Sequence, residues 1–111
     1  MDKIIYSDGN ANTWIISPSG LEYIPVTPQE SSSGIYSGGV PVNKTITSLV
    51  YQKICEATDT IFRSGKPFLV MRTMGSVQIR RIMNDKEETV ILVSEDTNVI
   101  SLRTLLDEYI R

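Results

Sequence analysis

Short apolar runs separated by turn-forming residues occupy the first part of the chain. Residues 3–7 and 13–17 are rich in isoleucine and aromatic side chains, and a stretch of turn formers, SDGNAN, separates them. The tripeptide PSG at 18–20 is a second turn signal, and the run LEYIPV at 21–26 follows it. Runs of β-branched and aromatic residues between turn formers are typical of strands. This pattern predicts two or three strands in a hairpin or meander.

The clearest helical pattern covers residues 45–64, where apolar positions recur at steps of three and four. The stripe consists of Ile46, Leu49, Val50, Ile54, Ala57 and Ile61. Asn43 or Thr45 is suited to cap the start, because both side chains accept hydrogen bonds from free N–H groups. Gly65 and Pro67 are typical of the residues that follow a helix.

After this helix the pattern changes to a period of two. Apolar and polar residues alternate in residues 68–74 and again in residues 77–83, as they do in strands with two different faces. Gly75 and Ser76 lie between the two runs and suit a two-residue turn. The pattern therefore predicts a β-hairpin that covers residues 68 to 83.

The last part of the chain predicts one strand and one helix. Residues 84–88 are polar and indicate a loop, whereas residues 89–94 are almost continuously apolar, as in a central strand or one covered on both faces. From residue 99 to 111, leucines, Tyr109 and Ile110 recur on one helical face. The candidate caps at its start are Asn98 and Ser101.

Burial of these faces favours an α+β domain, with a single antiparallel sheet of about five strands and two helices packed against it. At 111 residues the chain is expected to be one domain, 1–111. The element order, β-β-(β)-α-β-β-β-α, resembles the profilin-like group, in which longin and roadblock domains place a helix between a hairpin and a three-stranded meander. The resemblance is one of element order alone, so it implies a fold and no activity.

A long loop rich in proline, serine and glycine, residues 25–42, interrupts the pattern. Its central stretch, SSSGIYSGG, contains two large apolar residues, Ile35 and Tyr36. Burial of each such side chain contributes roughly 1.5–3 kcal/mol, which offsets part of the cost of ordering the glycines. The loop is therefore expected to pack on the domain or on a second subunit.

Ser37, Gly38, Gly39 and Lys44 form a candidate site for a small ligand or an anion. Residues 38–45 are close to the phosphate-binding pattern G-x-x-x-x-G-K-[ST], with asparagine at the second glycine. The start of a helix also presents free N–H groups to anions. However, a nucleotide-binding loop follows a buried parallel strand, which is not predicted here. The alternative is that this segment only begins the helix.

Composition limits the chemistry that the chain can perform. Apolar residues make up 41% and charged residues 22%, as in ordinary globular domains. There is no histidine, so the usual acid or base at neutral pH is missing, and the single cysteine, Cys55, can form neither an intrachain disulfide nor a zinc site. We therefore predict no catalytic residue and no cofactor. Composition does not exclude a carboxylate site for Mg²⁺ or Ca²⁺, but the sequence has no clustered D-x-D-x-D-G pattern, so no metal is predicted. An enzyme would have to use carboxylates, lysine or serine.

The chain is predicted to have no membrane partner. No apolar run approaches the ~20 residues that a membrane-spanning helix requires. The N-terminus also lacks the apolar stretch of a signal peptide, so a cytoplasmic location is expected.

Positive charge is concentrated in residues 63–86, which carry six cations and one acid. Such a segment could contact nucleic-acid phosphates. The alternative is that its arginines pair with Glu87, Glu88, Glu95 and Asp96, and the net charge of −2 for the whole chain favours this second interpretation.

The predicted hairpin places two arginines among apolar residues of one sheet face. A face wholly in the core would not accept unpaired charges, so this face is either exposed or has the arginines at its edges. An exposed apolar face marks an interface, most simply in a two-fold homodimer. The candidate interface residues are Ile35, Tyr36, Phe68, Val70, Arg72, Ile79 and Arg81.

Two hypotheses follow for function. The first is a non-catalytic protein-interaction or regulatory adaptor module that associates with itself. The second is a sensor domain that binds a small ligand or an anion through the Ser/Gly loop and the start of the main helix.

Overall fold

The computed structural model describes residues 2–9, 12–25, 41–63 and 75–110. These residues form an α+β structure with two helices and one antiparallel sheet. The helices are α1 (Ser48–Phe62) and α2 (Thr97–Ile110). The strands are β1 (Lys3–Ser7), β2 (Thr13–Ser17), β3 (Gly20–Ile24), β4 (Val42–Thr45), β5 (Ser76–Met83) and β6 (Lys86–Val93). The strand order across the sheet is β4-β3-β2-β1-β5-β6, so the sheet has six strands rather than about five.

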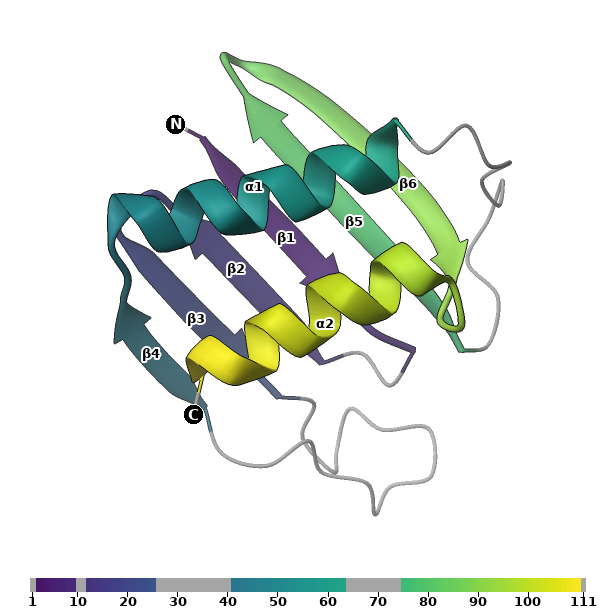
Figure 1. Cartoon of the computed structure of the whole chain (residues 1–111), viewed down its shortest axis with the longest axis horizontal. Coiled ribbons are helices and arrows are strands. Elements are labelled where there is room, and N and C mark those ends of the chain that lie inside the picture. Colours follow the sequence, from purple (N-terminus) through teal and green to yellow (C-terminus); the bar gives the residue numbers. More distant parts are fainter. Residues whose placement is uncertain (1, 10–11, 26–40, 64–74, 111) are drawn as a thin grey trace.

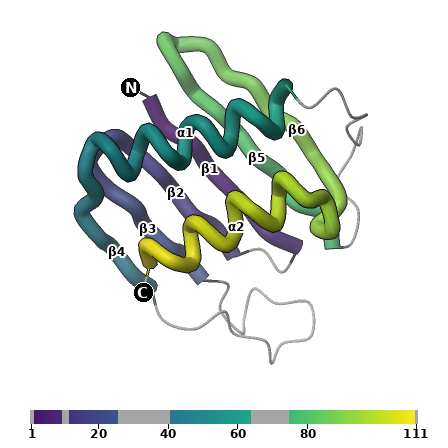
Figure 2. Tube along the Cα trace, in the orientation of Figure 1, coloured from purple at the N-terminus to yellow at the C-terminus, as the bar shows by residue number. Residues whose placement is uncertain are grey.

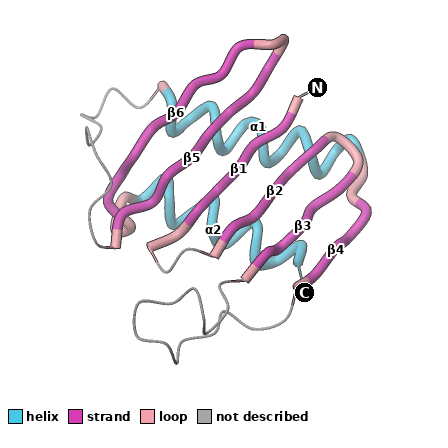
Figure 3. Tube along the Cα trace, turned by 180° about the vertical axis from the view of Figure 1, so that it is seen from behind, coloured by secondary structure: helices cyan, strands magenta, loops and turns pink. Residues whose placement is uncertain are grey.

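Both helices lie on the same face of the sheet (Figure 1), and the view from behind shows the strands in front of them (Figure 3). The two helices cross the strands and run in opposite directions (Figure 2). The core lies between the helices and the sheet. Its fully buried side chains include Ile4, Tyr6, Trp14, Ile16, Leu21, Ile54, Ile61, Ile79, Leu102 and Leu106. Within the described ranges, neither helix is long and apolar enough to span a membrane.

The first three strands confirm the predicted N-terminal meander. Ile4 is paired with Ile16, and both side chains are buried beneath the helices. Their neighbours Ile5 and Ile15 also face each other across the same strand pair, and they are only partly buried. Side chains of a strand point alternately to opposite faces, so the first pair belongs to the core and the second to the other side of the sheet.

The strand β4 was not predicted, and it changes where the main helix begins. Residues 43–45 pair with β3 instead of starting the helix, and α1 begins at Ser48. Its cap is Thr47, whose hydroxyl accepts a hydrogen bond from the N–H of Val50 at 3.3 Å. The predicted caps, Asn43 and Thr45, are therefore wrong. The sequence VNKT shows no clear alternation of apolar residues, so only its pairing partner reveals the strand.

The first strand of the predicted hairpin, residues 68–74, lies outside the described residues. Its second strand corresponds to β5, which has β1 on one side and β6 on the other. A hairpin joins β5 to β6 through Asn84 and Asp85, which have φ angles of 51° and 65°. Asparagine and aspartate tolerate this left-handed region better than most residues. Two strands, rather than a meander of three, therefore follow α1 in the described part of the chain.

The second helix begins two residues earlier than predicted. The carboxylate of Asp96 accepts hydrogen bonds from the N–H groups of Asn98 at 2.9 Å and Val99 at 3.2 Å. Asp96 is therefore the cap, rather than Asn98 or Ser101. From this start α2 places Val99, Leu102 and Leu106 in the core.

Candidate functional site

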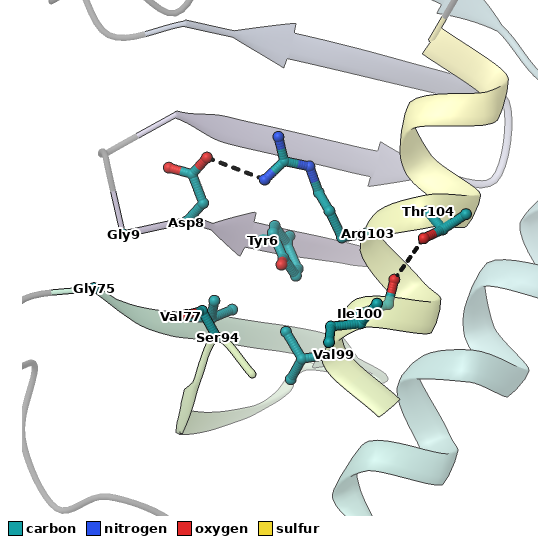
Figure 4. Close-up of a pocket in the computed structure, with 10 residues that line it drawn as sticks. All are labelled: Tyr6, Asp8, Gly9, Gly75, Val77, Ser94, Val99, Ile100, Arg103 and Thr104. Atoms are coloured by element: carbon teal, nitrogen blue, oxygen red, sulfur yellow. Dashed lines mark hydrogen bonds and ion pairs between the residues drawn. The ribbon is translucent and has the colours of Figure 1, made fainter. Parts of the chain in front are cut away.

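A cavity of about 370 Å³ lies where β1 ends, β5 and α2 begin, and β6 has just ended. Its lining combines apolar side chains, such as Val77 and Val99, with the polar groups of Asp8, Arg103 and Thr104 (Figure 4). A concave site with an apolar body and a few convergent polar groups is the usual form of a small-molecule pocket. This pocket is therefore the first candidate site.

Two of the residues that line the pocket are glycines at which two segments of backbone approach closely. A Cβ atom on Gly9 would lie 2.7 Å from the Cα of Gly75, closer than real contacts allow. Gly75 itself has a φ of 79°, a conformation that other residues adopt only at a cost. Gly9 is therefore required for the close approach of the two backbones, and Gly75 for its backbone conformation.

Arg103 is held in the pocket by two carboxylates and an aromatic ring. Its Nη1 donates to Asp8 at 3.2 Å, and its Nε donates to Asp107 at 3.2 Å. The guanidinium carbon lies 4.3 Å from the centre of the Trp14 ring. Burial acts to lower the pKa of Arg103, but the two carboxylates outweigh it and raise that pKa. The side chain therefore remains a cation with a defined position.

Asp8 connects this arginine to the turn after β1. Its carboxylate accepts hydrogen bonds from the N–H of Asn12 at 2.9 Å and from the side-chain amide of Asn12 at 3.1 Å. Both residues are buried. Buried carboxylates need such partners, because an unpaired charge away from water is costly. Asp8 thus joins the turn between β1 and β2 to α2.

Tyr6 also lines the pocket. Burial raises the pKa of Tyr6 to about 12, even though the nearby charge of Arg103 acts to lower it. Its hydroxyl is therefore protonated near neutral pH and can take part in hydrogen bonds, but it cannot act as a base. Its ring meets that of Trp14 edge to face, with 5.4 Å between centroids.

The balance of charge around Arg103 disfavours an anionic ligand. Asp8 and Asp107 both contact the guanidinium, so this group of three side chains has one more negative than positive charge. An anionic ligand would be a third negative group, and it would have to displace one carboxylate or lie close to both. The pocket is therefore better suited to an uncharged ligand with an apolar body and a hydrogen-bonding edge.

The second candidate site is the side of the sheet turned away from the helices, which we call the open face. No described element covers it (Figure 3). Ile5 and Ile15 lie at its centre and are half-buried, whereas Ile24 and Val93 are 43% and 49% exposed. Further apolar residues of this face are Ile82 and Ile91. The polar residues among them include Lys3, Glu22, Gln78, Arg80 and Glu87.

The structure contradicts the prediction that the sheet face of Ile79 and Arg81 is exposed. Ile79 is fully buried beneath the helices. Arg81 lies on the same covered side, where its side chain is 16% exposed and its guanidinium lies over the ring of Phe62. It pairs with Asp59 of α1 and with Glu88, each at 3.1 Å.

The alternative prediction, that the arginines pair internally, is confirmed for two of them. Arg80 pairs with Glu87, as Arg81 does with Glu88. Lys44 lies in β4, opposite Leu21, and does not line the pocket. The other predicted site residues fall outside the described ranges; they are Ile35, Tyr36, Ser37, Gly38, Gly39, Phe68, Val70 and Arg72.

The described residues thus form a small α+β fold with a pocket of mixed polarity and a sheet face that none of the described elements covers. Within the described residues, no group of three or more cysteine, aspartate or glutamate side chains is placed to hold a metal ion. The chain matches no protein-family model, and no curated protein or solved structure was found to be similar to it.

Proposed function

We propose that this protein is a non-catalytic interaction or regulatory module that associates with itself through the open face. The observation that carries the proposal is the pair of isoleucines, Ile5 and Ile15, at the centre of that face. An antiparallel sheet with one face in water normally alternates apolar inward and polar outward residues. In β1 and β2 the outward central position is apolar instead, so this face is poorly adapted to water.

The free energy gained by burying the apolar side chains of the open face supports association in the micromolar range. Full burial of one isoleucine contributes about 1.5–3 kcal/mol, and the half-buried residues here would contribute part of that. Several such residues on each copy must also offset the cost of bringing two molecules together. A dissociation constant near 1 μM corresponds to about 8 kcal/mol after that cost has been subtracted, so burial of several apolar side chains on both copies is required.

The pocket groups support binding rather than catalysis. Arg103 is held by two carboxylates, and the raised pKa of Tyr6, about 12, keeps its hydroxyl protonated near neutral pH. Neither group can therefore take a proton from a substrate under these conditions.

Replacing Ile15 with lysine tests the proposal. The new charge would be buried in the interface without a partner, so we expect the dissociation constant of the self-associated form to rise about tenfold or more. Sedimentation velocity across micromolar concentrations measures this, and circular dichroism checks the fold. The matched control is Leu49→Lys, because Leu49 is 61% exposed on α1, on the other side of the molecule. Equal association of both variants would contradict the proposal.

A second candidate function is favoured by the pocket, namely the binding of a small uncharged ligand beside Arg103. The matched probes benzamide and benzoate have the same ring but differ in charge. We expect benzamide to shift the backbone amide NMR signals of Val77 and Ile100, which line the pocket, and benzoate to shift them less. Preferential binding of benzoate would show that the excess of carboxylates does not control the site.

A further inference from the structure

We infer that the occupant of the open face is a second copy of this chain, packed face to face about a two-fold axis that runs along the strands between β1 and β2. The inference rests on the proposed function and specifies its geometry. It is carried by one row of residues that crosses the centre of the sheet.

That row has opposite charges at its ends and isoleucines in its middle. Arg80 of β5 is paired with Ile5 of β1, which is paired with Ile15 of β2. Ile15 is in turn paired with Glu22 of β3. The four residues therefore occupy one line across four adjacent strands, and all four point to the open face.

A half-turn about the inferred axis makes this row complementary to itself. The operation exchanges β1 with β2 and β5 with β3, so Ile5 of one copy lies over Ile15 of the other. Arg80 of one copy then lies over Glu22 of the other, and the symmetry produces this pair twice. An interface of this kind uses the same patch on both partners. Complementary charges at its ends would set the register.

The same operation brings no like charges together in the next row. That row runs from Ile82 to Lys3, and Ser17 and Gly20 follow at the positions set by the neighbouring pairs. The half-turn places Ile82 over Gly20, and the cation Lys3 over the hydroxyl of Ser17. These two rows of the open face are thus compatible with the two-fold axis.

The twist between packed sheets is small enough for the charges to meet. Aligned sheets cross at about 30°. Because Arg80 and Glu22 each lie about 7 Å from the axis, this angle moves Arg80 of one copy about 4 Å along the strands from Glu22 of the other. The sheets lie ~10 Å apart, and two long side chains can bridge both separations.

Arg80 has donors left for a second carboxylate. Its Nε and Nη2 both donate to one oxygen of Glu87, and Nη1 has no acceptor among the described residues. Its side chain is 40% exposed, and Glu22 is also exposed. Glu87 therefore orients the guanidinium without using all of its donors.

The area is adequate for a specific dimer of moderate affinity. A sheet of six strands, spaced ~4.8 Å apart and about five residues long, covers about 500 Å² of flat area. The accessible surface of its side chains exceeds that flat area and approaches the ~800 Å² per partner of a standard interface.

Charge exchange tests the inferred axis. Arg80→Glu and Glu22→Arg each turn both intermolecular pairs into like charges, so each is expected to raise the dissociation constant about tenfold or more. The double variant exchanges the two charges and is expected to restore association to within about threefold of the original value. Sedimentation velocity measures all four proteins. Glu22→Arg leaves the contact between Arg80 and Glu87 intact, so it also reports on the axis if Arg80→Glu folds poorly.

Matched controls are Lys53→Glu and Glu56→Arg, which make the same charge changes at exposed positions of α1. If Ile15→Lys weakens association but the charge exchanges behave like these controls, the axis is wrong and the proposed surface stands. If Ile15→Lys has no effect on a protein that does associate, the surface itself is wrong. A chain that stays monomeric at the highest soluble concentration overturns the inference that a second copy is the occupant.

Discussion

Replacing Trp14 with alanine is expected to lower the free energy of unfolding by about 3–5 kcal/mol. Trp14 is 1% exposed and is a central residue of the core. Its ring contacts those of Tyr6, at 5.4 Å between centroids, and Tyr23, at 4.8 Å, and it supports the guanidinium of Arg103. Alanine would leave a cavity under α2 and remove the surface on which Arg103 lies, so the pocket should loosen as well.

The matched variant is Trp14→Phe, which keeps an aromatic ring. The indole N–H of Trp14 is buried and has no acceptor among the described residues, and such an orphaned donor costs about 1–3 kcal/mol. Phenylalanine removes that cost while losing some packing, so its net loss should be well below that of alanine. Urea unfolding followed by circular dichroism measures both, because the only tryptophan is lost. Equal losses for the two variants would contradict this account of Trp14.

Raising the pH from 8 to 11 is expected to destabilise the protein by about 1.4 kcal/mol through Tyr6 alone. The pKa of Tyr6 is about 12 in the folded protein, against 10.0 for a tyrosine surrounded by water, because burial disfavours the charged phenolate. Between these values the unfolded chain loses the proton and the folded chain keeps it. The difference stabilises the unfolded chain, so stability is unaffected below pH ~10 and falls as the pH rises towards ~12.

The comparison with Tyr6→Phe isolates this effect from the other groups that titrate in alkali. Burial also raises the pKa of Tyr51, but that residue is present in both proteins and its contribution cancels. Urea midpoints at the two pH values should therefore fall further for the original protein than for the variant. An equal fall in both would show that Tyr6 ionises as freely in the folded protein as in the unfolded chain.

The local sequence was sufficient to predict an element whose own residues form a clear strand or helix pattern. The strands β1 and β2 lie at the predicted residues, because isoleucine and aromatic runs between turn formers favour an extended backbone. The core of α1 was predicted in part, since Ile54 and Ile61 of the apolar stripe are buried, whereas Leu49 is 61% exposed. The ends of the helices were less well predicted, because Thr47 and Asp96 are two among several residues able to cap.

Elements that depend on a distant partner were missed. The strand β4 has no marked pattern of its own and exists through its pairing with β3. The turn signal at Gly75-Ser76 gave no indication that β5 pairs with β1, across a separation of some 75 residues. A local turn preference contributes much less to stability than a full row of strand hydrogen bonds and a buried face.

By itself, the sequence determined that this is an α+β fold with two helices and a single antiparallel sheet, and that Ile79 and Arg81 share one face of a strand. It did not determine which face the helices cover, because a period of two separates the residues into two faces but does not indicate which face is buried. Only the tertiary structure decided that Ile79 is in the core and that Ile5 and Ile15 remain uncovered. It also brought Asp8 together with Arg103, which lies 95 positions away. Local patterns cannot encode such a pairing, since it arises from the packing of the whole chain.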